Sequence, residues 1–368
     1  MDGVNVNSLV VESEMSHTWM IYGANGYTGR LAARVAADRG LKPILAGRHA
    51  DTIRALADDV GCEWRAFDLR DPAVIATNLQ GVAAVLHCAG PFSATSRPML
   101  DACQRAGTHY LDITGEIAVF EEIHSRNQEI RDARIVAIPG VGFDVVPTDC
   151  LAAMLKRELP SATHLKLAFM ARNGKLSPGT AKTMVEGLPD GGRIREHGKI
   201  VKVPPAYKIE TIPFTETISA RAVTIPWGDV ATAYYSTGIP NIEVFVGAPD
   251  EQIEKMKMPG VLRSLLGLAP VQTVVKALIA RRVKGPSDEQ RARDETYVYG
   301  EVRDEAGHKA VMRLRTREGY TLTAESGVTA IVKILEGSLA PGAYTPSMAF
   351  GAEYVLELEG TALSRVTP

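Results

Sequence analysis

Short apolar runs alternate with amphipathic stretches over the first part of the chain, from about residue 17 to residue 139. The apolar runs are continuous, which is typical of strands in a parallel sheet that has helices on both faces. The expected strands are 18–23, 43–47, 62–67, 82–90, 109–113 and 133–138. Helices are expected over 27–39, 50–59 and 95–106, with others beginning at Asp71 and Glu116. This regular order predicts a doubly wound α/β fold.

The pattern changes after about residue 150, where runs with the character of strands dominate. These runs are 163–170, 221–225, 231–237, 241–247, 296–303 and 309–316. Connections rich in proline and glycine are expected at 177–192 and 203–213, and helices at 261–283 and 320–336. Such a mixture predicts a second domain of the α+β class rather than a second parallel sheet.

Composition fits a globular protein of two domains. The 368 residues correspond to roughly two domains at ~150 residues each. Hydrophobic residues at 45% and charged residues at 23% exclude a disordered or fibrous chain. Lys and Arg number 41 against 43 Asp and Glu, so no overall basic field attracts nucleic acid.

Cysteine use and the apolar segments point to the cytoplasm. The cysteines are Cys62, Cys88, Cys103 and Cys150. They form no C-x-x-C pair and have no histidine cluster at zinc spacing, so we expect a reducing compartment and no metal site. Residues 1–16 contain no Lys or Arg, which argues for a disordered leader and against a secretory signal. The apolar stretch 259–280 holds Arg263 and Lys276, so no membrane-spanning helix is expected.

A glycine-rich turn directly after the first expected strand predicts a dinucleotide site. It reads Gly23-Ala24-Asn25-Gly26-Tyr27-Thr28-Gly29 and opens a helix. Gly23 permits the tight turn, Gly26 lets the backbone approach a pyrophosphate, and Gly29 lets helix and strand pack closely. The helix N-terminus supplies free N–H groups for the phosphates. The alternative, a glycine turn without a ligand, is less compatible with a turn between strand and helix.

The end of the second strand favours NADP(H) over NAD(H). An NAD site has Asp or Glu there to bind the ribose 2′-hydroxyl, whereas this chain has Arg48. A guanidinium can bind a 2′-phosphate through a forked contact. Asp68, after the third strand, is a candidate for the adenine amino group. The alternatives are an exposed Arg48 that begins a helix and an Asp68 that stabilises a turn.

Three later loops reach the carboxyl edge of the parallel sheet, where ligands bind in such folds. The first contains the expected nicotinamide contacts Cys88, Ala89, Gly90, Pro91 and Phe92. The other two contain the candidates for proton transfer, which are Tyr110, Asp112, Glu116 and Asp144. Structural alternatives are Glu116 as the cap of the following helix and Asp144 as a group that bonds its own turn. Cys88 could act as a nucleophile, but a small buried cysteine more often serves packing.

These segments together resemble the saccharopine dehydrogenase-like reductases, and most closely the bacterial trans-acting enoyl reductases. The resemblance rests on GANGYTG, AGR, HCAGPF, YLDITGE and GVGFDVVPTD, and further on SPGTAKTMVE, GPSDEQRAR and TPSMAFGAEYV. It implies a Rossmann-type domain that binds NADP(H), an oxidoreductase activity and a mixed-sheet second domain. It also implies that residues 320–368 return to the cofactor domain of 17–149, and that 150–319 form the domain for substrate and dimerisation.

Three functions remain open at this point. The first is an NADPH-dependent reductase of an activated double bond, such as an enoyl thioester or an enone. The second is a reductase of C=N bonds or an amino-acid dehydrogenase, and the third is an NADP-bound, lipid-associated scaffold without turnover. Because segments 87–92, 110–116 and 140–149 contain no Lys or Arg to bind a carboxylate, the sequence favours a weakly charged substrate. The chain also lacks the Tyr-x-x-x-Lys, G-x-S-x-G and P-loop motifs.

The substrate is expected in a cleft between the domains, because the nicotinamide must lie over the second half of the sheet. Segments 177–187 and 261–283 are the expected far wall. Segment 261–283 carries apolar residues at helical spacing and ends in Arg281, Arg282 and Lys284. Its alternatives are core packing, a lid over an acyl chain, a homodimer face and a peripheral membrane contact.

Overall fold

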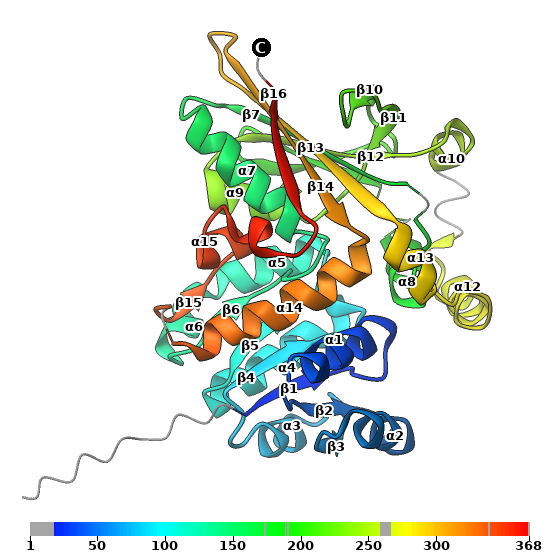
Figure 1. Ribbon diagram of the computed structural model, residues 1–368, viewed down its shortest axis with the longest axis vertical. Coiled ribbons are helices and arrows are strands. Elements are labelled where there is room, and N and C mark those ends of the chain that lie inside the picture. The colour runs from blue at the N-terminus through cyan, green and yellow to red at the C-terminus, as the bar shows by residue number, and fades with distance from the viewer. Residues whose placement is uncertain are drawn as a thin grey trace, which may run out of the picture.

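The computed structural model describes residues 18–172, 174–187, 189, 191–257, 266–337 and 339–366. Two sheets form the body of the molecule, the parallel sheet below and the mixed sheet above in Figure 1. The parallel sheet has seven strands in the order β15-β6-β5-β4-β1-β2-β3. Their bounds are β1 Trp19–Tyr22, β2 Ile44–Gly47, β3 Trp64–Ala66, β4 Ala84–His87, β5 His109–Asp112, β6 Val136–Ile138 and β15 Gly342–Ala343. The predicted doubly wound fold is therefore confirmed.

Successive residues of β1 enter different cores because helices cover both faces of the sheet. Trp19 and Ile21 pack under α1, α2 and α14, whereas Met20 and Tyr22 pack over α3, α4, α5 and α6. The bounds are α1 Tyr27–Asp38, α2 Ala50–Val60, α3 Pro72–Asn78, α4 Phe92–Ala106, α5 Ile117–Ser125, α6 Asn127–Asp132 and α14 Gly319–Leu335. All four residues of β1 are buried, which explains the continuous apolar run.

The second sheet has nine strands and is mixed. Its main path is β10-β11-β12-β7-β13-β14-β16, with the hairpin of β8 and β9 beside β12. The β12–β7 pair is parallel and the other pairs are antiparallel. The bounds are β7 His164–Ala171, β8 Gly192–Glu196, β9 Lys199–Val203, β10 Ile209–Pro213, β11 Ser219–Thr224, β12 Asn241–Gly247, β13 Glu295–Arg303, β14 Lys309–Arg317 and β16 Ala362–Val366.

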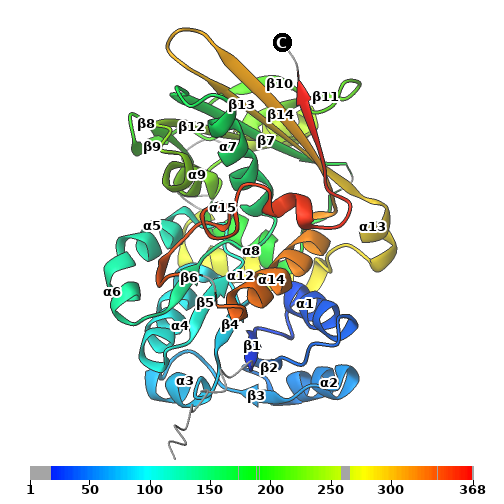
Figure 2. The same ribbon diagram turned by 60° about the vertical axis from the view of Figure 1, so that its left-hand side comes forward.

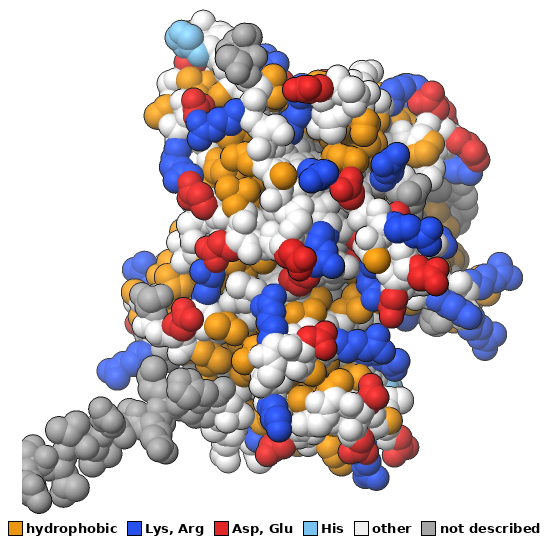
Figure 3. All heavy atoms as spheres, viewed as in Figure 1, with side chains coloured by type: hydrophobic (Ala, Val, Ile, Leu, Met, Phe, Trp, Pro, Cys, Tyr) orange, Lys and Arg blue, Asp and Glu red, His pale blue; other side chains and the backbone are white. Residues whose placement is uncertain are grey.

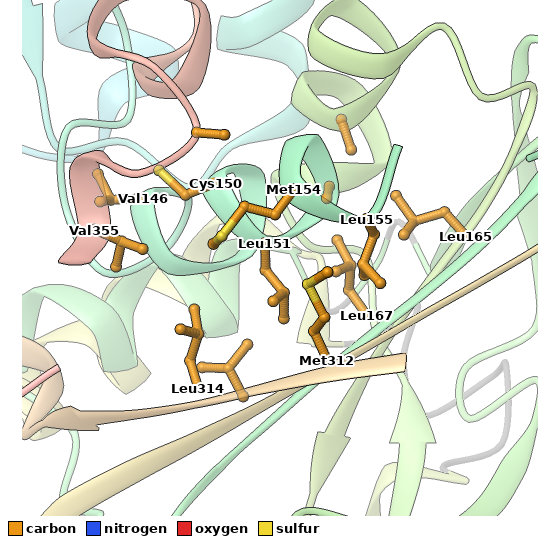
Figure 4. Packing of buried hydrophobic residues seen from close by; sticks show 14 of the residues in the cluster. Val146, Cys150, Leu151, Met154, Leu155, Leu165, Leu167, Met312, Leu314 and Val355 are labelled. Atoms are coloured by element: carbon orange, nitrogen blue, oxygen red, sulfur yellow. The ribbon is translucent and has the colours of Figure 1, made fainter. Parts of the chain in front are cut away.

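The core of the second domain lies under one face of this sheet. Leu151 and Leu155 from α7 (Val146–Glu158) pack against Leu167, Met312 and Leu314 from the strands (Figure 4). Helix α9 (Asp229–Thr237) packs beside α7 and adds Val230 to this cluster. Figure 2 shows both helices between the second sheet and the elements of the first domain. Helix α7 therefore leads from the loop after β6 of the parallel sheet directly into the core of the second domain.

Several expectations for the second half were wrong. Residues 231–237, expected as a strand, belong to α9, because Gly238 in the left-handed conformation ends a helix whose small residues pack on α7. The expected connection 203–213 contains β10, whereas helix α8 (Pro178–Gly187) within 177–192 agrees with the alternative of a helix over 180–187 after a Pro-Gly turn. The β8–β9 hairpin was missed altogether, because its charged residues hide the alternation expected of a strand.

The elements that follow residue 318 contribute to both domains. Helix α14 packs on α1 and β4 of the parallel sheet, and β15 pairs with β6. Strand β16 instead pairs with β14 of the second sheet. The expectation that all of 320–368 returns to the cofactor domain was therefore wrong for the last strand, which supplies the edge of the second sheet.

The predicted helix over 261–283 is in part outside the described residues, which omit 258–265, as is the predicted leader 1–16. The described part is α12 (Ala269–Arg282), which follows α10 (Asp250–Met256) and precedes α13 (Asp288–Arg293). None of its described side chains is buried, so core packing does not explain its apolar residues. Within the described part of the chain, no helix is long and apolar enough to cross a membrane.

Candidate active site

The glycine-rich turn forms a compact cradle at the carboxyl end of β1. Gly23 has a φ of 81°, and a Cβ there would lie 2.8 Å from the backbone nitrogen of Ala89. A Cβ at Gly29 would overlap the carbonyl oxygen of Gly23. Gly26 caps α1 without a side-chain hydrogen bond, and the first turn of α1 has no acidic residue. These features leave backbone N–H groups and the positive end of the helix open to a phosphate.

Arg48 and Asp68 are the residues that the sequence analysis assigned to the adenosine part of the cofactor, and Asn25 belongs to the glycine-rich turn. Arg48 is exposed after β2. Hydrogen bonds from Arg70 lower the pKa of Asp68, and the charge of Arg48 adds to this effect. Burial raises the pKa of Tyr22 to about 12, although the charge of Arg48 opposes this shift. The Asp68 carboxylate already accepts hydrogen bonds from the backbone and the guanidinium of Arg70, at 2.9 Å for each nitrogen. The Asn25 amide donates to Thr52 Oγ1 over 3.1 Å. Arg48 is therefore the cation that remains available for a 2′-phosphate.

Glu116 connects two of the predicted loops. Its carboxylate oxygens accept from the backbone N–H groups of Phe92 and Ser93, each at 2.8 Å. It therefore stabilises the N-terminus of α4, the helix that follows β4. The Glu116 side chain makes no capping hydrogen bond to α5, the helix that it precedes. Burial raises the pKa of Glu116, and negative charge on Glu186 adds to this effect. Glu116 thus positions the loop 88–92 that the sequence assigned to nicotinamide.

Cys88 begins this loop. Burial, aided by the charge of Asp112, raises the pKa of its thiol to about 12. A thiol with such a pKa is protonated at neutral pH, so a nucleophilic role is not favoured. Ala89 and Cys88 instead lie against Gly23 and hold the glycine-rich turn.

Tyr110 and Asp112 form a buried pair below the cleft. The Tyr110 hydroxyl donates to Asp112 Oδ2 over 2.6 Å, and Asp112 Oδ1 accepts from the backbone N–H groups of Thr114 and Gly140 at 3.0 and 2.8 Å. Both side chains are fully buried. Desolvation raises the pKa of Asp112 to about 6. This pair ties the end of β5 to the end of β6, and we propose a structural role for both residues.

Asp144 is placed differently from the other acidic candidates. It follows β6, and its Oδ2 would lie 2.6 Å from a Cβ at Gly115. Its carboxylate has no hydrogen-bond partner within the described residues, so it does not bond its own turn. Desolvation raises its pKa to about 7, and the side chain keeps partial access to solvent. Among the four acidic and tyrosine candidates, Asp144 is therefore the one whose carboxyl group is free of hydrogen bonds to the described residues and can exchange a proton with solvent.

Tyr320 is a site residue that the sequence analysis missed. Its hydroxyl accepts from the backbone N–H of Ser177 over 2.6 Å and lies 2.9 Å from Thr180 Oγ1. Burial raises the pKa of Tyr320, and the charge of Asp144 raises it further. The first turn of helix α8 is thereby held against the start of α14. The only sequence signal is an aromatic residue in the first turn of α14, which is indistinguishable from a core residue.

A second missed contact crosses the domain boundary at the glycine-rich turn. The Tyr27 hydroxyl donates to the carbonyl oxygen of Pro286 over 2.6 Å and accepts from Arg291 Nη1 over 2.9 Å. The rings of Tyr27 and Tyr320 meet edge to face, with centroids 5.0 Å apart. These contacts place segment 285–291 beside the expected pyrophosphate site. They could not be predicted, because 264 residues separate Tyr27 from Arg291.

The fold and this cradle define a two-domain protein whose first domain binds a dinucleotide, and the residues fit NADP(H). Residues 19–138 match the family model described as the saccharopine dehydrogenase NADP binding domain. The resemblance to this family that was inferred from the sequence is therefore confirmed for residues 19–138.

Related sequences and one solved structure extend the similarity beyond the first domain. The chain is 30% identical over 219 residues to the "Trans-acting enoyl reductase" of Mycobacterium leprae, covering 55% of this chain and 50% of that protein. It is 26% identical over 217 residues to the protein of the same name from Mycobacterium ulcerans, with the same coverage. The chain thus spans about half the length of the curated relatives it matches.

The fold resembles that of apo saccharopine dehydrogenase (L-Glu forming) from Saccharomyces cerevisiae. The two structures superpose with a TM-score of 0.66 at 11% sequence identity, covering 95% of this chain and 100% of that chain. At this identity the likeness concerns the fold alone, including the mixed-sheet second domain.

Proposed function

We propose that this protein is an NADPH-dependent oxidoreductase that reduces an activated double bond in a weakly charged substrate, such as an enoyl thioester or an enone. The observation that carries the proposal is Asp144. It is a half-buried acid without a hydrogen-bond partner in the described residues, it lies against Gly115, and its charge acts on Tyr320. The names of the mycobacterial relatives support an enoyl substrate.

When bound, NADPH supplies a hydride. Reduction also requires a proton for the substrate atom that becomes negatively charged. With a pKa of about 7, Asp144 holds this proton for a large part of the time near neutral pH. It donates the proton from its carboxyl oxygen and regains one from water through its exposed side. Glu116 meanwhile holds the backbone of Phe92 and Ser93, which keeps loop 88–92 in place.

The side chains around Asp144 favour a weakly charged substrate over an amino acid. Asp144 itself, Glu116 and the hydroxyl groups of Ser177, Thr180 and Tyr320 supply no positive charge for a substrate carboxylate. Lys276, which lies behind α8, is paired with Glu186. An amino-acid or saccharopine-type substrate needs cations for its carboxylates, ideally Arg in bidentate geometry. The alternative of a C=N reductase is therefore less favoured.

A spectrophotometric panel tests the proposal. NADPH consumption is followed by the absorbance of the reduced nicotinamide with enoyl thioesters, with enones, and with 2-oxo acids plus an amine. We expect turnover with members of the first two groups and none with the third. Cofactor binding is measured in parallel by nicotinamide fluorescence.

Two outcomes contradict the proposal in different ways. Turnover confined to 2-oxo acids with amines supports the C=N alternative. Tight NADPH binding without consumption in any group supports a cofactor-bound scaffold.

A further inference from the structure

Helices α8 and α12 carry an unusual share of the exposed apolar side chains. Nine large apolar residues are exposed in the described part of the chain, and five of them lie on these helices or directly before them. The five are Leu176, Met184, Leu268, Val274 and Leu278. Val274 is 60% exposed and Leu278 45%, and their spacing of four residues puts them on one face of α12. Such clustering marks an interaction surface rather than scattered surface residues.

Basic side chains lie on the same face of α12, at the C-terminal end of the helix. Arg281 lies seven residues after Val274, and Arg282 lies four residues after Leu278, so both project near these apolar side chains. Lys284 follows directly after the helix. All three are exposed, and none has an ion-pair partner among the described residues. Figure 3 shows Lys and Arg side chains projecting where α12 lies.

The contacts of α12 with the described residues lie away from Val274 and Leu278. The helix packs on α8, where Gln272 donates to the Val185 carbonyl oxygen over 2.8 Å and Lys276 pairs with Glu186. Val271, Val275 and Ile279 lie half-buried along the flank between this face and the side that meets α8. Val274 and Leu278 themselves lie opposite Gln272 and Lys276, so they are not needed to attach α12 to α8.

We infer that this face, defined by Val274, Leu278, Arg281 and Arg282, docks on a membrane surface that carries anionic lipids. A helix with apolar residues and cations on its exposed side lies in a lipid interface, with the cations at the headgroups. A second copy of this chain is a poorer match. Helix α12 contains no Asp or Glu that could meet Arg281 and Arg282 of another copy.

The location of this face relates it to the cleft. Ser177 and Thr180 at the start of α8 contact Tyr320, and Glu186 near its end influences the pKa of Glu116. Helix α8 thus contacts Tyr320 through its first turn and packs on α12. Docking of α12 would bring this part of the molecule close to lipids.

Co-sedimentation of the full chain with vesicles tests the inference without any substrate. The vesicles are pure phosphatidylcholine or phosphatidylcholine with phosphatidylglycerol. We expect binding to the anionic vesicles that weakens with added salt. The double variant Arg281→Glu/Arg282→Glu should lose binding by at least about tenfold, because each cation contributes roughly fivefold at an anionic surface. Val274→Ser/Leu278→Ser should weaken binding to the anionic vesicles as well.

A matched charge control distinguishes this surface from a general charge effect. Arg105 and Arg131 are exposed on the first domain and have no ion pair among the described residues. Arg105→Glu/Arg131→Glu changes the net charge equally and should retain binding. Equal loss in both charge variants, or no vesicle binding by the unmodified chain, overturns the inference. A dimer in light scattering that Val274→Ser/Leu278→Ser dissociates, without vesicle binding, also overturns it and assigns the face to a second copy.

Discussion

Arg291 of the second domain donates a hydrogen bond to the hydroxyl of Tyr27 in the glycine-rich turn, with 2.9 Å between Nη1 and the hydroxyl oxygen. The same hydroxyl donates to Pro286. Gly285 makes this approach possible, because a Cβ there would lie 2.6 Å from the Tyr27 ring. The residue that begins helix α1 in the cofactor cradle is thus fixed by the second domain, which ties the relative position of the domains to the cradle itself.

Replacing Tyr27 by Phe should destabilise the protein by about 1–2 kcal/mol. The variant loses both hydrogen bonds of the hydroxyl, and each contributes on the order of 1 kcal/mol net. Unfolding in urea measures the change. Tyr207→Phe is the control, because the Tyr207 side chain is exposed. Equal effects of the two substitutions would mean that the contact across the domain boundary contributes nothing.

Arg48→Ala should weaken NADPH binding by roughly 10- to 100-fold and leave NADH binding nearly unchanged. The reason is that a charge-assisted hydrogen bond to a 2′-phosphate contributes about 1.5–3 kcal/mol, and NADH lacks that phosphate. Titration of nicotinamide fluorescence measures both affinities. The control is Arg105→Ala, on the far end of α4. An unchanged NADPH affinity in Arg48→Ala would remove Arg48 from the cofactor site.

Glu116→Gln should lower stability by about 1–2 kcal/mol and disturb loop 88–92. An amide presents one acceptor oxygen in place of two, so either Phe92 or Ser93 loses its partner, and the negative charge at the N-terminus of α4 is removed. Urea unfolding together with NADPH titration measures the effect. Glu336→Gln, at an exposed position, is the control. If the unfolding curves of the two variants coincide, the loop does not depend on Glu116.

Much of the first domain was predictable, because its local signals agree with its tertiary structure. Continuous apolar strands, a glycine-rich turn and a proline at the start of α3 each point to the observed element. The second domain gave weaker signals. In 231–237 small and β-branched residues suggest a strand, but burial of Val230 and Ala233 against the second sheet and α7 decides for a helix.

The candidate site was predictable only where its residues lie at the ends of successive strands. Parallel strands bring such ends together, which is why Asp112, Glu116 and Asp144 meet near one edge. Which of these carboxyl groups is free for proton transfer depends on hydrogen bonds that the spacing of residues in the sequence does not reveal. Asp112 is occupied by Tyr110 and two backbone groups, and Glu116 by the start of α4. Tyr320 and Arg291 come from distant segments and gave no local signal.

Asp144→Asn should reduce the rate of double-bond reduction by about 10²- to 10⁴-fold, the usual contribution of a positioned acid, while NADPH still binds. Activity of the unmodified protein should fall as the pH rises through about 7, because proton donation needs the protonated carboxyl group. The variant should lack this fall. Asp51→Asn, at an exposed position in the first turn of α2, is the control.

The same carboxyl group makes stability depend on pH in a defined direction. Burial raises the pKa of Asp144 from 3.8 to about 7, so the folded state keeps a proton that the unfolded state releases above about pH 4. The contribution of Asp144 to stability is therefore fully present below pH 4 and is lost as the pH rises to about 7. Urea unfolding between pH 4 and 8 should show a smaller loss of stability in Asp144→Asn than in the unmodified protein. Parallel curves for the two proteins would mean that Asp144 titrates normally, and would remove it as the proton donor.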